Sequence, residues 1–457
     1  MAAHDAPLVA WCSDDLTGSV DVLDALLGAG VRGALFVDAP SEADLARVGD
    51  DVGAIGVAGM TRTLPTAALR ETLRPLFTRL AATGAPILHY KVCSTFDSSP
   101  EIGSIGAALD LLDDLLAPQF LPLLAAAPRL GRYTVFGNHF ARSGSAPEVH
   151  RLDRHPTMRK HPVTPMTEAD LRVELARQTA LPLGLVSAVA IGGGDAGART
   201  ALDDAVAGGA RVVVLDALDD AHMATLGGLL WERALAAGPL PIVGSAGVEH
   251  ALAAHWRASG QARATEVPAY TAPAGPILAV AGSRSPVTDV QIEHAVAGGF
   301  AEIAPPLEDL LAGDERAVEV ALPAALDALA DGRSPLVHSA GAPIAVARQD
   351  RRLDTAQARR LGAALGAVAD AVLGAGAATR VAVAGGDTSG DVVRRLGVVS
   401  LEALAPFGPA MPLCRATAPG RAGDGAELIF KGGQTGTADF FGDVLRDQPT
   451  LDKEYVT

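Results

Sequence analysis

The chain has 457 residues, of which 49% are hydrophobic and 20% charged, so it is long enough for two or three domains with buried cores. A net charge of −16 and an aromatic content of 4% argue against a nucleic-acid partner, although a local group of Lys and Arg can still bind a small anion. Three widely spaced cysteines support neither a disulfide framework nor a zinc site, and no basic leader or long apolar run predicts secretion or a membrane partner, so we expect a cytoplasmic protein.

Short apolar runs recur along the first half of the chain, and most are separated by helical patterns such as residues 42–48 and 68–84. Each run is apolar throughout rather than at every second position, which predicts parallel strands covered by helices on both faces. The runs lie at residues 7–15, 33–39, 52–59, 86–94, 133–138, 185–194, 211–217 and 240–247.

Residues 138–170 interrupt this alternation with a long, basic segment rich in His and Pro. We expect a loop here, either a lid that faces an anion or a solvated surface loop. Its three histidines, His150, His155 and His161, have the spacing of no standard metal motif.

The alternation stops again at a polar, Pro-bearing stretch near residue 265 and restarts at residue 276. We therefore predict an α/β fold with two domains, each a mostly parallel sheet flanked by helices, and an active-site cleft between them. The predicted bounds are 1–262 for the first domain, 263–275 for the linker and 276–457 for the second domain.

Polar residues gather just after the strands of the first half, where ligands of open parallel sheets bind. The acids Asp14 and Asp15 follow the first strand, and one of them could simply cap the next helix. Capping explains two adjacent acids poorly, so we interpret the pair as functional. A carboxylate of this pair can accept a proton from a hydroxyl, while the neighbouring cations and hydroxyls suit a small polyhydroxy carboxylate. The substrate-binding candidates are Arg62, Lys91, Ser94, Thr95 and Asp97.

The strand ends of the second half are rich in Gly, which lets backbone N–H groups approach phosphate oxygens at a helix start. Four such loops in one domain, one of them with a lysine, predict a phosphate or nucleotide site that is not a Walker-type P-loop. The candidates are Ser283, Ser285, Gly341, Gly385, Gly386, Asp387, Thr388, Ser389, Lys431, Gly432, Gly433 and Gly436.

A rival pattern predicts a different enzyme. Gly192, Gly194 and Gly197 have the G-x-G-x-x-G spacing, and Asp216 ends the next apolar run about 20 residues on, as a dinucleotide-binding fingerprint requires. This alternative is an NAD(P)-dependent oxidoreductase with its cofactor in the first domain.

Together, several motifs resemble the four-carbon acid sugar kinase family over nearly the whole chain. "DDLTGSVD" at 14–21 resembles the amino-terminal motif of that family, and "YKVCSTFDSS" at 90–99 resembles its 3-oxo-tetronate kinase branch. "FGNHFARSG" at 136–144 and "RLDRHPTM" at 151–158 are more similar to the 3-oxo-isoapionate kinase branch. "GGDTSG" and "KGGQTG" in the second half stand where the family has related Gly-rich motifs, although Gly432, Gln434 and Thr435 depart from the family pattern.

The resemblance implies that the first domain binds a sugar acid and that the second binds ATP through Ser283 or Ser285, the loop 385–389 and Gly433. We expect in-line transfer of the γ-phosphoryl group of ATP to a primary hydroxyl, with Asp15 or Asp14 as the proton acceptor. Mg²⁺ should bridge the phosphates, and Asp387 is a candidate ligand. A non-catalytic sugar-acid-binding or effector protein is the remaining alternative, and the oligomeric state, a homodimer included, is left open.

Overall fold

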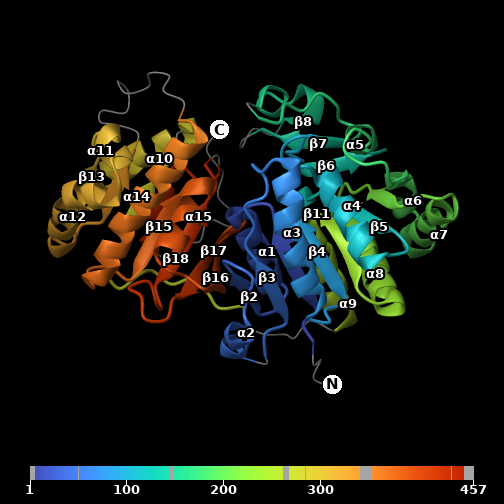
Figure 1. Cartoon of the computed structure of the whole chain (residues 1–457), viewed down its shortest axis with the longest axis horizontal. Coiled ribbons are helices and arrows are strands. Elements are labelled where there is room, and N and C mark those ends of the chain that lie inside the picture. Colours follow the sequence, from blue (N-terminus) through green and yellow to red (C-terminus); the bar gives the residue numbers. More distant parts are fainter. Residues whose placement is uncertain are drawn as a thin grey trace. The chain divides into compact units, whose positions relative to one another are not determined.

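The computed structural model describes residues 6–49, 51–143, 148–161, 163–260, 267–283, 285–339, 353–433 and 435–446. It divides into two compact units, Met1–Ala34 with Asp38–Glu266, and Leu35–Val37 with Val267–Thr457 (Figure 1). Across the described ranges, every helix is too short or too polar to pass through a membrane.

The first unit is built on a parallel sheet in the order β3-β1-β4-β11-β5-β10-β9, which confirms the predicted sheet type. Its strands are buried because helices cover both faces, so each reads as an apolar run. The strands are β1 (Val9–Ser13), β3 (Ala54–Val57), β4 (Ile87–Lys91), β5 (Leu121–Leu124), β9 (Leu183–Val186), β10 (Val212–Leu215) and β11 (Leu240–Gly244), and β2 (Gly33–Phe36) lies at the division between the units.

Two groups of helices flank this sheet. Helices α3 and α4 pack on one face, while α1, α8 and α9 pack together on the other (Figure 1). The helices of the unit are α1 (Leu16–Gly28), α2 (Glu42–Val48), α3 (Thr66–Ala81), α4 (Ile105–Leu116), α5 (Leu171–Leu175), α6 (Ala188–Gly192), α7 (Gly194–Ala207), α8 (Asp220–Ala237) and α9 (Gly247–Ser259).

The expected loop at 138–170 is partly wrong, because this region contributes to a second, antiparallel sheet. That sheet consists of β6 (Arg132–Val135), β7 (Asn138–Arg142) and β8 (Val149–Arg151). Phe136 and Gly137 connect β6 and β7 with positive φ angles of 49° and 80°, as a two-residue hairpin turn requires. Three short 3-10 turns flank the sheet, η1 (Pro128–Leu130), η2 (Leu152–Arg154) and η3 (Met158–Lys160).

The second unit holds the parallel strands β13-β14-β12-β15-β18, extended by the antiparallel strands β17 and β16. The antiparallel hairpin was not among the predicted strands. The strands are β12 (Leu278–Ala281), β13 (Ala301–Ile303), β14 (Pro335–His338), β15 (Arg380–Ala384), β16 (Ser400–Gly408), β17 (Met411–Thr417) and β18 (Glu427–Lys431).

Helices also cover both faces of this second sheet. Helices α12, α14 and α15 pack together on one face, and α10 packs with α16 on the other. The described helices are α10 (Pro286–Ala297), α11 (Leu307–Leu311), α12 (Asp314–Ala330), α14 (Thr355–Gly374), α15 (Gly386–Arg395) and α16 (Phe440–Val444).

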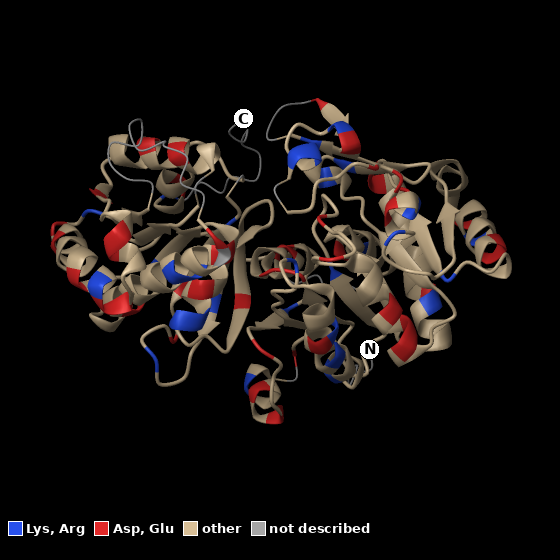
Figure 2. Cartoon of the chain, turned by 45° about the horizontal axis from the view of Figure 1, so that its top comes forward, with Lys and Arg blue, Asp and Glu red and all other residues tan. Residues whose placement is uncertain are grey.

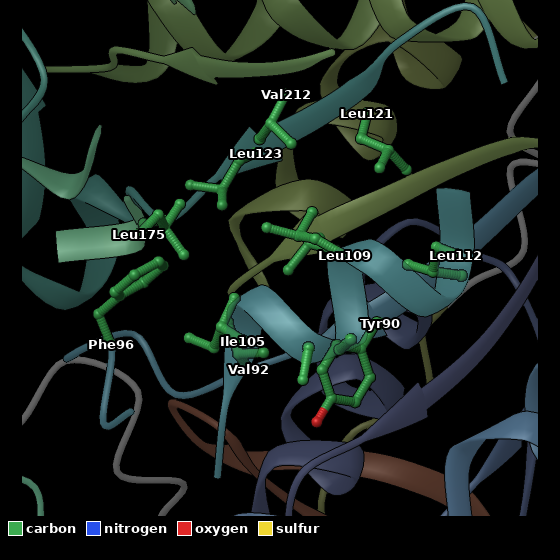
Figure 3. Packing of buried hydrophobic residues seen from close by; sticks show 14 of the residues in the cluster. Tyr90, Val92, Phe96, Ile105, Leu109, Leu112, Leu121, Leu123, Leu175 and Val212 are labelled. Carbon is green, nitrogen blue, oxygen red and sulfur yellow. The ribbon is translucent and has the colours of Figure 1, made fainter. Parts of the chain in front are cut away.

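Strand β4 shows how one strand serves both the core and the site. Tyr90 and Val92 point into the apolar cluster formed with α3 and α4 (Figure 3). Because successive side chains of a strand point to opposite faces, His89 and Lys91 lie on the face covered by α1 and α9. The strand therefore places an imidazole and an ammonium inside the protein, on the side where the helix after Asp15 begins.

Candidate active site

The acidic pair lies at the end of β1, and the two carboxylates have different partners. Asp15 is the N-cap of α1, since its Oδ1 accepts from the Gly18 backbone N–H over 2.8 Å and its Oδ2 accepts from Thr17 Oγ1 over 2.8 Å. Asp14 caps nothing and accepts from the Cys93 backbone N–H over 3.2 Å. Capping thus accounts for Asp15 and leaves Asp14 for another role.

Arg62 bridges the two acids with all three of its guanidinium nitrogens. Its Nε and Nη2 donate to the two oxygens of Asp14 over 3.0 and 2.8 Å, and its Nη1 donates to Asp15 over 2.8 Å. Burial raises the pKa of Asp14 in spite of this pairing. Burial acts the same way on Asp15, but Arg62, Lys91 and the capping hydrogen bonds outweigh it and lower the pKa of Asp15. Asp14 is therefore the better proton acceptor near neutral pH.

Lys91 belongs to a buried row of charges on the other side of the acidic pair. Its ammonium lies 3.9 Å from Asp21 on α1, and burial raises the pKa of Asp21 to about 6. Next to Asp21, His89 and Glu249 are fully buried, and His89 Nδ1 lies 2.5 Å from Glu249 Oε1. A Cβ at Gly18 would lie 2.4 Å from Lys91 Nζ, so Gly18 leaves the space that the ammonium needs.

The residues after β4 form a fixed loop, 93–97, beside Asp14. Phe96 has a φ of +60°, which is rare for a bulky residue, and its fully buried ring packs in the core (Figure 3). His139 of β7 donates from Nε2 to the Ser94 carbonyl over 2.8 Å. Thr95 donates to Asp97 over 2.7 Å. The structure thus brings the predicted residues of this loop close to Asp14 and Arg62.

In the second unit, the candidate phosphate loop lies between β15 and α15. Gly385 has a φ of +128°, and a Cβ there would lie 2.9 Å from Thr388 Oγ1 and 3.2 Å from the Ser283 nitrogen. Among the described residues, no side chain caps the N-terminus of α15, whereas Ser285 caps α10 by accepting from the Val287 N–H over 3.3 Å. The uncapped N–H groups of α15 are suited to phosphate oxygens.

Three Gly-rich segments of this unit come together around Ser283. Its backbone N–H donates to the Ala384 carbonyl over 3.3 Å, and a Cβ at Gly433 would lie 2.5 Å from its Oγ. The Gly385 N–H donates to the Lys431 carbonyl over 3.0 Å, and Ser389 Oγ donates to the Gly385 carbonyl over 2.7 Å. Gly436 closes the last loop with a φ of +93°, while the predicted Gly341 lies outside the described residues.

Lys431, a predicted phosphate contact, already has partners inside the second unit. Its side chain is fully buried, and its Nζ donates to Thr288 Oγ1 over 3.2 Å and to the Gly432 carbonyl over 2.9 Å. Burial lowers the pKa of Lys431 to about 7. In this structure Lys431 therefore binds the Gly432 carbonyl and Thr288 from inside the unit.

The dinucleotide-binding alternative is wrong. Gly192 ends helix α6, and Gly194 and Gly197 lie in the first turn of helix α7, so these glycines do not join a strand to a helix. Asp216 is fully buried, and its carboxylate accepts from the backbone N–H groups of Phe136, Gly137 and Ala188 over 2.5, 2.9 and 2.9 Å. Asp216 therefore anchors the β6–β7 turn and the start of α6 instead of facing a ribose.

Sequence reasoning missed four residues that shape the first site: Asp21, His89, His139 and Glu249. A signal was present for two of them, because His89 lies inside the buried strand β4 and Asp21 interrupts the apolar side of α1. Polar residues at such positions need partners. The other two, Glu249 on α9 and His139 on β7, could not be found from sequence spacing.

Comparisons with known proteins match the two units to two different domain families. Residues 9–252 match the family model of a sugar-binding N-terminal domain, and residues 278–441 match that of a nucleotide-binding C-terminal domain. The chain belongs to the four-carbon acid sugar kinase family. This membership confirms the enzyme class predicted from the sequence, an ATP-dependent phosphotransferase.

Individual relatives match over almost their full length. A protein of Paraburkholderia graminis named 3-oxo-isoapionate kinase is 42% identical, covering 95% of this chain and 93% of the relative. A protein of Pseudomonas savastanoi pv. phaseolicola named 3-oxo-tetronate kinase is 34% identical, covering 96% of this chain and 97% of the relative. A crystal structure from Salmonella typhimurium, solved as a proposed tRNA synthase, superposes with a TM-score of 0.79 at 25% identity, covering 96% of this chain and 99% of that one.

Proposed function

We propose that the chain transfers the γ-phosphoryl group of ATP to a primary hydroxyl of a small sugar acid, with 3-oxo-isoapionate favoured over 3-oxo-tetronate. The observation that carries the proposal is Asp14, a carboxylate at the end of β1 that is paired with Arg62 and has no capping role. The choice of substrate rests on the 42% identity to the relative named 3-oxo-isoapionate kinase against 34% for one named 3-oxo-tetronate kinase.

Asp14 is the proposed proton acceptor for the attacking hydroxyl. Its pKa is raised by burial, so its basicity exceeds that of an ordinary aspartate. Arg62 orients the carboxylate through two hydrogen bonds, and the Cys93 N–H adds a third. The loop 93–97 then supplies Ser94, Thr95 and Asp97 as candidates to bind hydroxyl or oxo groups of the substrate.

The nucleotide belongs, in this proposal, to the second unit. The N-terminus of α15 and the backbone around Ser283, Gly385 and Gly433 would hold the phosphates. Because phosphoryl transfer depends on positioning and charge, a set of fixed N–H donors is sufficient protein machinery for this half of the reaction. The transfer itself requires the bound phosphate and the bound hydroxyl to meet during turnover.

We expect Mg²⁺ to bind to this protein as a complex with the phosphates of ATP. Among the described residues, no three His, Cys, Asp or Glu side chains are grouped so as to hold a metal ion. Mg²⁺ bound to nucleotides commonly keeps several waters and takes only one or two carboxylates, which fits the single acid Asp387 in the first turn of α15. When bound, the ion would neutralise phosphate charge.

The test is a coupled ADP-release assay with 3-oxo-isoapionate, 3-oxo-tetronate, threonate and erythronate. We expect turnover with 3-oxo-isoapionate at the highest kcat/KM and weaker turnover with 3-oxo-tetronate. Absence of turnover with all four acids would count against the proposal and would favour a non-catalytic sugar-acid-binding protein. A thermal-shift measurement with ATP–Mg²⁺ and with NAD⁺ adds a check of the cofactor, since only ATP–Mg²⁺ should stabilise the protein.

A further inference from the structure

The cations first expected to bind the substrate carboxylate are already occupied. Every guanidinium nitrogen of Arg62 donates to Asp14 or Asp15, and the Lys91 ammonium lies beside Asp21. Three carboxylates and two cations leave this group with one net negative charge. An incoming carboxylate would be repelled here, so its binding requires a positive group elsewhere in the site.

The β6–β7 hairpin presents such a group to the loop 93–97. Thr134 pairs with His139 and Arg132 pairs with Ala141, so all four side chains share one face of the hairpin. Thr134 Oγ1 and His139 Nδ1 are 3.0 Å apart, and His139 Nε2 donates to the Ser94 carbonyl. The face that carries Arg132 is therefore the face that lies against the loop.

Among the residues that the structure describes, Arg132 has no carboxylate within ion-pair distance. Its Nη1 donates to the carbonyl oxygens of Leu130 and Arg142 over 3.0 and 3.2 Å and weakly to that of Gly131 over 3.4 Å, while its buried Nε has no partner among the described residues. Within the described parts of the chain, no carboxylate forms an ion pair with it. Burial lowers the pKa of Arg132, whereas the nearby Asp97 carboxylate raises it.

The surroundings of Arg132 are electropositive. Arg142, His150 and His155 lie on or beside the same small sheet, and Asp97 is the one carboxylate that acts on both Arg132 and His155 within the described residues. Figure 2 shows Lys and Arg gathered over this part of the first unit, at the upper right of the view. Arg132 is half-buried, and the nearby Asp97 carboxylate forms no ion pair with it, so the guanidinium can still bind an anion, and its planar fork matches a carboxylate.

We infer that Arg132 binds the carboxylate of the sugar acid and so selects anionic substrates. The inference rests on the proposed function and changes its details, because Arg62 and Lys91 then orient Asp14 and Asp15 and do not hold the substrate. The acid group lies toward β6 and the reacting hydroxyl toward Asp14, with the loop 93–97 between them. His139 is a positioning residue that fixes this loop through the Ser94 carbonyl.

The experiment compares Arg132→Gln with Arg132→Lys. Loss of a charge-assisted hydrogen bond should raise KM for the sugar acid about 10- to 100-fold in Arg132→Gln, with KM for ATP unchanged and a smaller change in kcat. Arg132→Lys keeps the charge and should recover part of the affinity. Arg129→Gln is the matched control, because Arg129 lies on the adjacent turn η1 and forms an exposed ion pair with Asp220.

A neutral carboxamide analogue of the sugar acid separates charge recognition from a structural role. Wild type should use the carboxamide poorly, and Arg132→Gln should use it as well as wild type does. Equal losses on the acid and on the carboxamide would overturn the inference, since they would mean that Arg132 only supports the turn at residues 128–131.

Failure of the proposed function has a different signature. If wild type turns over none of the four sugar acids, calorimetric titration of each acid into wild type and Arg132→Gln still measures the affinity of the site for that acid. Weaker binding of an acid to Arg132→Gln would then support the inference alone, and binding that is unchanged by the substitution would contradict it.

Discussion

The two units use the ends of their parallel strands in opposite ways. The first unit fills this edge with side-chain charges, since Asp14, Asp15, Arg62 and Lys91 all follow or end strands there. The second unit places Gly385 and Gly433 at this edge, and among the described residues no side chain caps the N-terminus of α15. Sugar acids differ from one another in the placement of their hydroxyl and acid groups, so a site that distinguishes them needs charged and polar side chains at fixed positions. A triphosphate needs many N–H donors at short range, which backbone supplies best.

The largest expected effect separates the two adjacent acids. Asp14→Asn should lower kcat about 10²- to 10⁴-fold, because a general base is lost. Asp15→Ser is the matched control, since serine also caps helices well, and kcat should stay within about tenfold of wild type. Stopped-time ADP-release assays at saturating substrate measure both. A severe loss in Asp15→Ser with activity retained in Asp14→Asn would reverse the assignment.

The second prediction concerns the backbone of the nucleotide site. Gly385→Ala forces an L residue into a φ of +128° beside Thr388, at a strain of roughly 1–3 kcal/mol, so KM for ATP should rise several-fold to about 100-fold. KM for the sugar acid should not change. Gly313→Ala supplies the control, because Gly313 has a φ of +132° with open space around it, before α12. An equal effect of both variants on ATP would show that strain alone, and not the site, explains the result.

Asp21 provides the third prediction, through its pairing with Lys91. Burial raises the pKa of Asp21 to about 6, so Asp21 loses its charge as the pH falls through 6 and Lys91 loses its counter-ion. Wild-type kcat/KM should therefore decline below about pH 6. Asp21→Asn should be about tenfold less active at pH 8 and should lose the decline near pH 6 that Asp21 causes, while the decline caused by protonation of Asp14 remains. The same limb in variant and wild type would assign it to another group.

The smallest effect is a pH dependence of stability in the second unit. Burial lowers the pKa of Lys431 from 10.5 in the unfolded chain to about 7, so the cost of the buried charge is fully present below pH 7 and is relieved as the pH rises toward 10.5. Between pH 7 and 9, the unfolding free energy of wild type should rise by roughly 1–2 kcal/mol more than that of Lys431→Met. Denaturant titrations without nucleotide measure this. Parallel pH profiles would mean that Lys431 stays charged in the folded state.

Much of the fold could be predicted from the sequence because buried parallel strands carry a local signature. The runs before Asp14, Ser94 and Gly385 are mostly apolar on both faces, and each became a central strand. The run at 185–194 was harder, since only its first two residues lie in strand β9 and residues 188–192 form helix α6. Periodicity alone does not distinguish a short buried strand from a short buried helix.

Strand β6 overlaps with the predicted run at 133–138, but β7, β8 and the hairpin β16-β17 were missed for a different reason. These missed strands mix polar and apolar residues, and Pro406 and Pro412 lie within the hairpin, which disfavours a strand prediction.

The candidate site could be predicted only in part. The residue types at the strand ends indicated the acidic pair and the glycine loops, but the sequence spacing did not show which side chains bind one another. The N-cap role of Asp15 depends on its backbone angles, and the contact from His139 to Ser94 depends on how the hairpin folds back.

The most direct test of the two-site account is a crossed calorimetric titration. ATP–Mg²⁺ and the sugar acid are each titrated into wild type, Asp14→Asn and Gly385→Ala. The account predicts that Asp14→Asn keeps wild-type affinity for ATP–Mg²⁺ although it is catalytically dead, and that Gly385→Ala loses affinity for ATP–Mg²⁺ but keeps it for the sugar acid. Loss of ATP–Mg²⁺ affinity in Asp14→Asn, or loss of sugar-acid affinity in Gly385→Ala, would contradict it.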